Sequence, residues 1–211
     1  MKMKQKKKLL KLKSTQMKAK ANVKAKPKSH LKAKTTNSAG DITSLILRDH
    51  VPLKKLILTL KDSKVEISKK QPAYEEFKRA LTVHAQAEEE SLYVHMKEED
   101  EGDDLRVEGY EGDTEHAIAI DLMQEIDEIR SNDDKWMAKV KVLAELVDHH
   151  IKEEENEFFK KIRKEFSTVE RTEIGKEYSR LLNQFSADED AEEEAADDEK
   201  SKPTATAEVW A

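Results

Sequence analysis

The chain has 211 residues and a formal net charge of −6, with 40% charged and 36% hydrophobic residues. The small number of helix-breaking residues, five glycines and four prolines, favours helices over sheet. The absence of cysteine excludes disulfides, thiolate catalysis, iron–sulfur clusters and Cys-type zinc sites. No apolar run approaches the roughly 20 residues that cross a bilayer, and the basic N-terminus lacks the apolar core of a secretion signal, so we expect a cytoplasmic protein.

The two ends of the chain carry opposite charge and few residues that could be buried. Residues 1–40 hold 14 lysines and no acidic residue, and residues 186–211 hold ten acidic residues and two lysines. Like charges repel and nothing offsets the entropy of ordering, so we expect both tails to be disordered. The fold is therefore expected within residues 41–185.

The first long helical pattern opens at Asp41, which is a good N-cap. Apolar residues and one histidine recur at steps of three and four and form the stripe Ile42, Ile46, His50, Leu53, Ile57 and Leu60. Pro52 lies inside this pattern and predicts a kink near His50.

The second and third helical patterns are separated by a break rich in glycine and acid. The second pattern starts after Pro72, and its stripe is Tyr74, Phe77, Leu81, His84, Glu88 and Leu92. The break includes residues 101–104, Gly109 and Gly112. The third pattern follows it with the stripe His116, Ile120, Met123 and Ile126.

The fourth long pattern begins near Asp133, and a weaker one covers about residues 169–185. The stripe of the fourth is Val140, Leu143, Val147, His150, Glu154 and Phe158. Four long helices joined by short loops predict an all-α fold, an up-down antiparallel four-helix bundle with an extra short C-terminal helix.

Polar residues interrupt the apolar stripes of all four long helices. They are His50 on the first, His84 and Glu88 on the second, His116 on the third, and His150 and Glu154 on the fourth. Both pairs have the spacing His-x-x-x-Glu, which presents an imidazole nitrogen and a carboxylate oxygen on one helix face. The four histidines recur at intervals of 34, 32 and 34 residues, which in an up-down bundle can bring them to a similar depth.

Burying four imidazoles and two carboxylates together is costly unless a positive charge compensates. Metal cations compensate directly, and imidazole with carboxylate but no thiolate suits iron, manganese or zinc. A single histidine on such a stripe is usually a hydrogen-bonded core residue, and one His-x-x-x-Glu arises by chance in a chain rich in glutamate. Recurrence on four helices favours a metal site with these six residues as ligands, and bridging carboxylates favour two metals.

The fourth helix also offers the register His149 to Glu153. The apolar stripe is in phase with His150 and Glu154, so we expect His149 to lie beside the core as a partner of a ligand. Two other histidines are expected to be unrelated to the site, namely His30 and His95.

Four segments carry the site residues, and together they resemble the hemerythrin HHE cation-binding domain. They are RDHVPLKKL around His50, HAQAEEESLY from His84, EH at 115–116 and HHIKEEENEFF from His149. The resemblance covers roughly residues 41–162. It implies a non-haem di-iron site with the four histidines as terminal ligands and with Glu88 and Glu154 as bridging carboxylates.

Two positions depart from the oxygen-carrying hemerythrins. Those proteins have a second histidine four residues after the one on the third helix, where this chain has Ile120, and an aspartate where it has Glu155. Six protein ligands leave more coordination positions for oxygen, peroxide or nitric oxide. Glu89, Glu115 and Glu153 are candidates for an extra ligand or for a partner of a ligand.

Three functions follow as hypotheses. The first is a metal-binding module that binds or responds to oxygen, peroxide or nitric oxide. The second is a di-iron oxidoreductase that reduces peroxide or oxidises ferrous iron, which ranks lower because no substrate pocket or electron-transfer partner is identifiable. The third is a nucleic-acid-associated protein, because the lysines of residues 1–40 would neutralise phosphates non-specifically.

Overall fold

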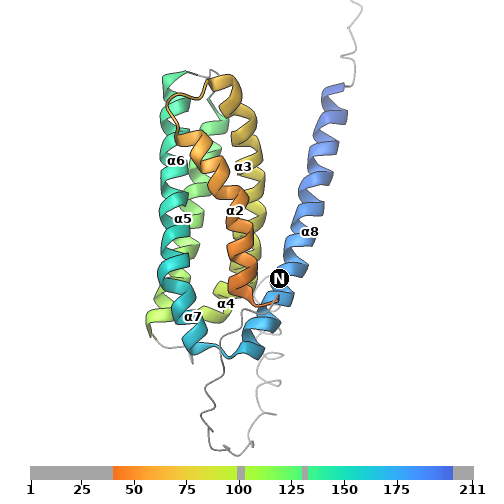
Figure 1. Cartoon of the computed structure of the whole chain (residues 1–211). Coiled ribbons are helices and arrows are strands. Elements are labelled where there is room, and N and C mark those ends of the chain that lie inside the picture. Colours follow the sequence, from red (N-terminus) through yellow and green to blue (C-terminus); the bar gives the residue numbers. More distant parts are fainter. Residues whose placement is uncertain (1–39, 99–102, 130–132, 202–211) are drawn as a thin grey trace, which may run out of the picture. The chain divides into compact units, whose positions relative to one another are not determined.

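The computed structural model of the chain describes residues 40–98, 103–129 and 133–201. Within these ranges the chain consists of helices joined by short turns, without any strand (Figure 1). The predictions of disorder for residues 1–40 and for residues 202–211 concern parts of the chain outside the described ranges, apart from Gly40.

Four helices form the predicted bundle. They are α2 (Ile42–Lys61), α3 (Ile67–Glu88), α5 (Asp103–Asp127) and α6 (Asp134–Glu153). α2 packs against α3 and α6, α5 packs against α6 and α3, and successive helices run in opposite directions (Figure 1). This arrangement confirms the all-α, up-down antiparallel bundle.

The helix starts follow from local hydrogen bonds. Asp41 caps α2 by accepting a hydrogen bond from the backbone N–H of Thr43 at 3.0 Å, as its position in the sequence predicts. α3 begins at Ile67, earlier than the predicted start after Pro72. The buried Lys70 explains this extension, because its Nζ donates to the carbonyl of Leu60 at 2.8 Å and joins the start of α3 to the end of α2.

Gly109 and Gly112 lie inside α5, so the expected break at these residues is wrong. Both glycines let α5 approach the end of the second helix closely. A Cβ atom at Gly112 would lie 2.6 Å from the ring of Tyr93, and one at Gly109 would lie 3.1 Å from Met96. The glycines therefore serve packing, and the helix passes through them.

Wide helical turns begin at or directly after the glutamate of both His-x-x-x-Glu pairs. α3 continues into the π-helical turn η1 (Glu89–Tyr93) and the short helix α4 (Val94–Met96). α6 continues into a second π-helical turn, η2 (Glu154–Phe158), and then into α7 (Phe159–Glu165). Such turns add one residue to a helix and occur frequently at functional sites.

The last helix, α8 (Thr168–Ser201), is much longer than the short helix predicted for residues 169–185. It extends through residues 186–201, where the sequence predicts disorder from charge repulsion. Alanine and glutamate are strong helix formers, and this preference accounts for the extension. α8 packs against α2, α3 and η1, which brings it close to the interior of the bundle.

Two apolar clusters fill the bundle on either side of the histidines. One contains Leu53, Phe77, Trp136, Val140 and other residues of the four main helices. The other contains Ile46, Leu92, Phe159, Ile162, Tyr178 and further residues that include part of α8. None of the described helices is both long enough and apolar enough to cross a membrane.

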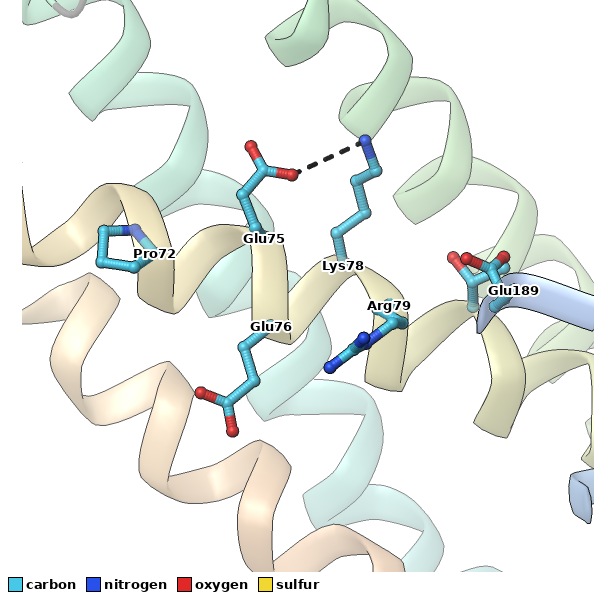
Figure 2. A pocket seen from close by; sticks show the side chains of 7 residues that line it. Pro72, Glu75, Glu76, Lys78, Arg79 and Glu189 are labelled. Atoms are coloured by element: carbon cyan, nitrogen blue, oxygen red, sulfur yellow. Dashed lines mark ion pairs between the residues drawn. The ribbon is translucent and has the colours of Figure 1, made fainter. Parts of the chain in front are cut away.

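A wide surface hollow in the described part of the chain is unrelated to the histidines. It has a volume of about 610 Å³, and its walls are mostly charged (Figure 2). Its lining includes Pro72, Glu75, Glu76, Lys78, Arg79 and Glu189. Because it contains none of the predicted ligands, the functional site has to be sought in the buried layer between the apolar clusters.

Candidate metal centre

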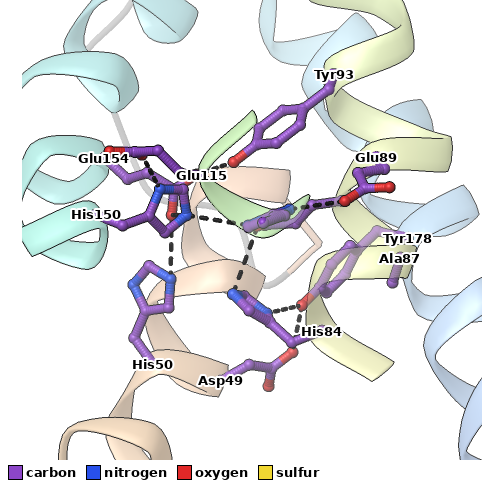
Figure 3. Close-up of polar contacts among 12 residues, drawn as sticks. Asp49, His50, His84, Ala87, Glu89, Tyr93, Glu115, His150, Glu154 and Tyr178 are labelled. Atoms are coloured by element: carbon purple, nitrogen blue, oxygen red, sulfur yellow. Dashed lines mark hydrogen bonds and ion pairs between the residues drawn. The ribbon is translucent and has the colours of Figure 1, made fainter. Parts of the chain in front are cut away.

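The structure brings all six predicted site residues together in one buried layer. Figure 3 shows four of them, His50, His84, His150 and Glu154. None of their side chains is more than 4% exposed, although all six are polar or charged. α2, α3, α5 and α6 each supply one histidine, and the carboxylates come from the end of α3 and the start of η2.

The donor atoms form two groups that share one glutamate. In each group, one donor atom from every residue lies within 4.8 Å of the others. The first group consists of His50, His84, Glu88 and Glu154, and the second consists of Glu88, His116 and His150. A spacing of this size is compatible with two neighbouring cations.

Each carboxylate lies between one histidine of each group. Glu154 Oε2 is 3.2 Å from His50 Nε2 and 3.6 Å from His150 Nε2. Glu88 Oε2 is 3.5 Å from the Nε2 of His84 and 3.7 Å from that of His116. Two carboxylates placed in this way can each reach two cations.

Every histidine of the site has an acceptor at Nδ1, on the side away from the centre. The pairs are His50 with Glu155 at 3.0 Å, His84 with Tyr178 at 2.9 Å, His116 with Glu89 at 3.0 Å, and His150 with Glu115 at 2.6 Å. Carboxylates only accept hydrogen bonds, so the imidazoles that face them donate from Nδ1. Each such imidazole then directs the lone pair of Nε2 toward the centre, as metal-binding histidines do.

Five buried nitrogen and oxygen atoms of the site have no hydrogen-bond partner among the described residues. They are Nε2 of His50 and of His84, both carboxylate oxygens of Glu88, and Oε2 of Glu154. Leaving a buried polar atom unpaired costs about 1–3 kcal/mol, and more when the group is charged. Imidazole nitrogens and carboxylate oxygens that converge without hydrogen-bond donors fit a metal cation, which would satisfy them together.

The histidines of the second group make the same point. Their Nε2 atoms, on His116 and His150, lie 3.1 Å apart. Since both rings donate from Nδ1 to carboxylates, this contact becomes favourable when one Nε2 carries a proton or when both Nε2 atoms bind a cation.

Burial and mutual charge separate the pKa values of the two central carboxylates. Burial raises the pKa of Glu88 well above its usual value, and the charge of Glu154 raises it further. Burial also acts to raise the pKa of Glu154, but the nearby His150 and His50 outweigh it and lower that pKa. A cation at the centre therefore competes with a proton on Glu88.

The pKa values of the histidines depend on the same balance. Burial lowers the pKa of His84 and that of His116, so both rings are uncharged near neutral pH and keep a nitrogen lone pair for a metal. Burial also acts to lower the pKa of His150, but the carboxylates of Glu154 and Glu115 outweigh it and raise that pKa.

The further residues that the sequence offers as partners of the site lie partly beside the buried layer and partly on the surface. Glu89 contacts His116 and Glu115 contacts His150, each at Nδ1, whereas Glu153 pairs with His149 at 3.3 Å on the surface. His149 is 64% exposed in its side chain and contacts no histidine of the layer, so it is not the partner expected of it. His95, which is expected to be unrelated to the site, is 42% exposed in its side chain, and His30 lies outside the described residues.

Sequence reasoning missed two tyrosines of the site. Tyr93 is fully buried, donates a hydrogen bond to Glu154 Oε1 at 2.8 Å, and stacks its ring on His116 with 5.4 Å between centroids. Tyr178 reaches His84 from α8. Their steps of three and four from apolar neighbours mark both as buried, but nothing in that pattern indicates which polar group they meet.

The comparisons agree with this geometry. The family model of the hemerythrin HHE cation-binding domain matches residues 41–162, a range that contains all six site residues and ends before α8. No curated protein and no solved structure matches the chain. Because the family match covers more than half of the chain, this protein is a cation-binding member of the hemerythrin HHE domain family.

Proposed function

We propose that the buried layer holds a non-haem di-iron centre. His50 and His84 would be terminal ligands of one metal, and the histidines of α5 and α6 terminal ligands of the other. Glu88 and Glu154 would bridge the two. The position of each Oε2 atom between one histidine of each group carries this assignment.

The donor set alone also suits zinc or manganese, and family membership favours iron. When bound, a pair of irons supplies open coordination positions and a change of oxidation state. The chain's own residues exclude bulk water, because every ligand is buried between the two apolar clusters. They also fix each imidazole from behind through Nδ1.

A small cavity leads to the second donor group. Its volume is about 10 Å³, its exposed wall atoms are apolar, and it reaches His116 and His150. It is lined further by Leu81, Ala85, Glu115, Ala119, Ile120, Leu146 and Val147. A space of about 10–15 Å³ is what a single water molecule needs, so this cavity has no room for an organic substrate.

From this cavity we infer a module that binds or responds to oxygen, nitric oxide or peroxide through its metal centre. Ile120 occupies the wall where the oxygen carriers place a further histidine, which leaves the second group with three protein donors.

Elemental analysis with optical spectroscopy tests the di-iron proposal. We expect about two irons per chain and a near-ultraviolet charge-transfer absorption that bleaches on reduction. Both should be lost in the double variant His84→Ala, His150→Ala. His149→Ala is the matched control, because it removes a neighbouring but exposed imidazole. A chain that stays folded without metal and takes up no iron anaerobically would refute the proposal.

Association with nucleic acid remains a prediction from residues 1–40, which lie outside the described residues apart from Gly40. It requires that duplex binding by the full chain be lost when residues 1–40 are deleted and decline steeply with salt. Equal binding by both chains would contradict it.

A further inference from the structure

One contact to the metal centre comes from outside the family's domain. Tyr178 lies in α8, beyond residue 162 where the family match ends, and it is fully buried. Its hydroxyl oxygen is 2.9 Å from His84 Nδ1 and 2.9 Å from Asp49 Oδ2 (Figure 3). The helix after the family's domain therefore reaches a proposed ligand directly.

The direction of these hydrogen bonds follows from the available protons. A phenol has a single proton, and the Asp49 carboxylate, which also accepts from Arg48 Nε at 3.2 Å, can only accept. Tyr178 thus donates to Asp49 and accepts from the Nδ1–H of His84. This leaves the lone pair of His84 Nε2 facing Glu88 Oε2, 3.5 Å away.

His84 differs from the other three histidines in its partner. Their Nδ1 atoms face the carboxylates of Glu155, Glu89 and Glu115, all inside the range that the family model matches. His84 alone depends on a tyrosine, and that tyrosine depends on α8. Without α8, the ring of His84 would have no fixed acceptor at Nδ1 and could turn or change tautomer.

α8 is held firmly enough to position a ring. Ile174 and Leu181, four residues before and three after Tyr178, are buried in the same apolar cluster. Gly175 lies so close to the backbone of Gly40 that a side chain would not fit there. The buried ion pair between Arg171 Nε and Asp41 Oδ2, at 2.7 Å, ties α8 to the start of α2.

We propose that Tyr178 is a positioning residue of the metal centre, which makes α8 a functional part of it. The hydroxyl holds His84 in the Nδ1–H tautomer, with Nε2 turned toward the carboxylate that both donor groups share. This inference rests on the proposed function in one respect, namely that His84 is a metal ligand.

The tautomer can be measured without metal. In ¹⁵N-detected long-range correlation spectra of the metal-free full chain, we expect the Nδ1–H tautomer for His84, and a mixture of tautomers in Tyr178→Phe. Tyr74→Phe is the matched control: its hydroxyl is also buried and donates to a carboxylate, Asp127, at 2.9 Å, but it lies in the other apolar cluster. Helicity and melting temperature of the two variants show that both remain folded.

Metal binding provides the second measurement. Outer partners of ligand histidines typically contribute about 10–100-fold to metal affinity, so we expect a loss of that order in Tyr178→Phe and none in Tyr74→Phe. The visible spectrum of the cobalt(II)-loaded protein should change only in the Tyr178 variant. The hydroxyl of Tyr178 touches one histidine of the centre, His84. A general loss of stability would not confine the change in affinity and spectrum to the Tyr178 variant.

The outcomes separate the two proposals. A wild-type chain that binds no metal overturns both the di-iron centre and the role of Tyr178. A wild-type chain that binds metal, while Tyr178→Phe shows the same affinity, spectrum and tautomer, overturns only the role of Tyr178. A His84 found with its proton on Nε2 in the metal-free wild type also overturns it.

Discussion

Gly112 of α5 lies directly against the ring of Tyr93, and a Cβ atom at that position would stand 2.6 Å from two ring carbons. The ring has no room to retreat, because it is fully buried and stacks on His116. Its hydroxyl donates to Glu154 at 2.8 Å. A glycine on one helix thus fixes the position of a proposed bridging carboxylate on another.

We therefore expect Gly112→Ala to weaken both the fold and the metal site. Overpacking of this kind costs about 1–3 kcal/mol, part of which the better helix propensity of alanine offsets. Chemical denaturation and a metal competition titration measure the two effects. Gly109→Ala is the control, because its Cβ would meet Met96 Cβ and Lys97 Cγ at 3.1 Å and would not press on the ring of Tyr93. Equal losses in both variants would contradict the role of Tyr93.

Glu115→Gln and Glu153→Gln should differ in metal affinity. Glu115 accepts from the Nδ1–H of His150 at 2.6 Å, whereas Glu153 pairs with the exposed His149. Removing the charge behind a ligand imidazole costs about 10–100-fold in metal affinity, so the first variant should bind iron more weakly and the second like the wild type. Competition with a chelator of known affinity measures this, and a reversed order would refute the hydrogen-bond assignment.

Asp41→Asn should destabilise the attachment of α8 in a pH-dependent way. Burial acts to raise the pKa of Asp41, but hydrogen bonds from Arg171 and Thr43 outweigh it and lower the pKa below 3.8. A lowered pKa in the folded state stabilises the fold above the unfolded pKa, and that contribution is lost as the pH falls through the folded value.

At pH 7 we expect Asp41→Asn to lose about 3 kcal/mol, because Arg171 keeps a buried charge without its carboxylate. Asparagine can still cap α2, so the cap alone does not explain a loss. The difference from wild type should shrink below the ordinary value of 3.8. Urea unfolding at several pH values measures it, with the exposed Asp62→Asn at the other end of α2 as control. A loss that does not vary with pH would contradict the ion pair.

Ile120→His should convert the small cavity into a further metal contact. Position 120 lies one turn after His116 on α5 and lines the cavity at the second donor group. An added imidazole there would supply a fourth donor, so we expect tighter iron binding and weaker binding of nitric oxide. Ile118→His, on the exposed side of the same helix, is the control. Unchanged nitric oxide binding in an iron-loaded Ile120→His protein would argue against ligand entry at this cavity.

The bundle and the convergence of the six polar residues could be predicted because both depend on local periodicity. Residues at i and i+4 share a helix face, and equal spacing along antiparallel helices gives equal depth. Two of the partners at Nδ1, Glu89 and Glu115, are among the candidates that the sequence offers. The other two could not be predicted, because they are distant in the sequence: Tyr178 is 94 residues from His84, and Glu155 is 105 residues from His50.

Gly112 and the end of α8 show two other limits of sequence reasoning. The sequence favours a break at a glycine, since glycine weakens a helix, unless a side chain from elsewhere needs the space. For residues 186–201, charge repulsion and helix propensity oppose each other, and the pattern alone does not reveal that propensity prevails.

The wide turns η1 and η2 occupy matching places in the chain. Each continues the second helix of a helical hairpin, α2–α3 or α5–α6: η1 begins one residue after Glu88, and η2 begins on Glu154. In both hairpins the single histidine of the first helix precedes the histidine of the second by 34 residues. Each hairpin is thus a unit with the same order of polar residues, a single histidine followed by a His-x-x-x-Glu pair.

Neither unit contains a complete donor group. The first group takes Glu154 from the second hairpin, and the second takes Glu88 from the first. Metal bound at this seam would act as a staple between the two halves of the molecule. Its removal should loosen the association of the hairpins while the helices within each of them remain wound.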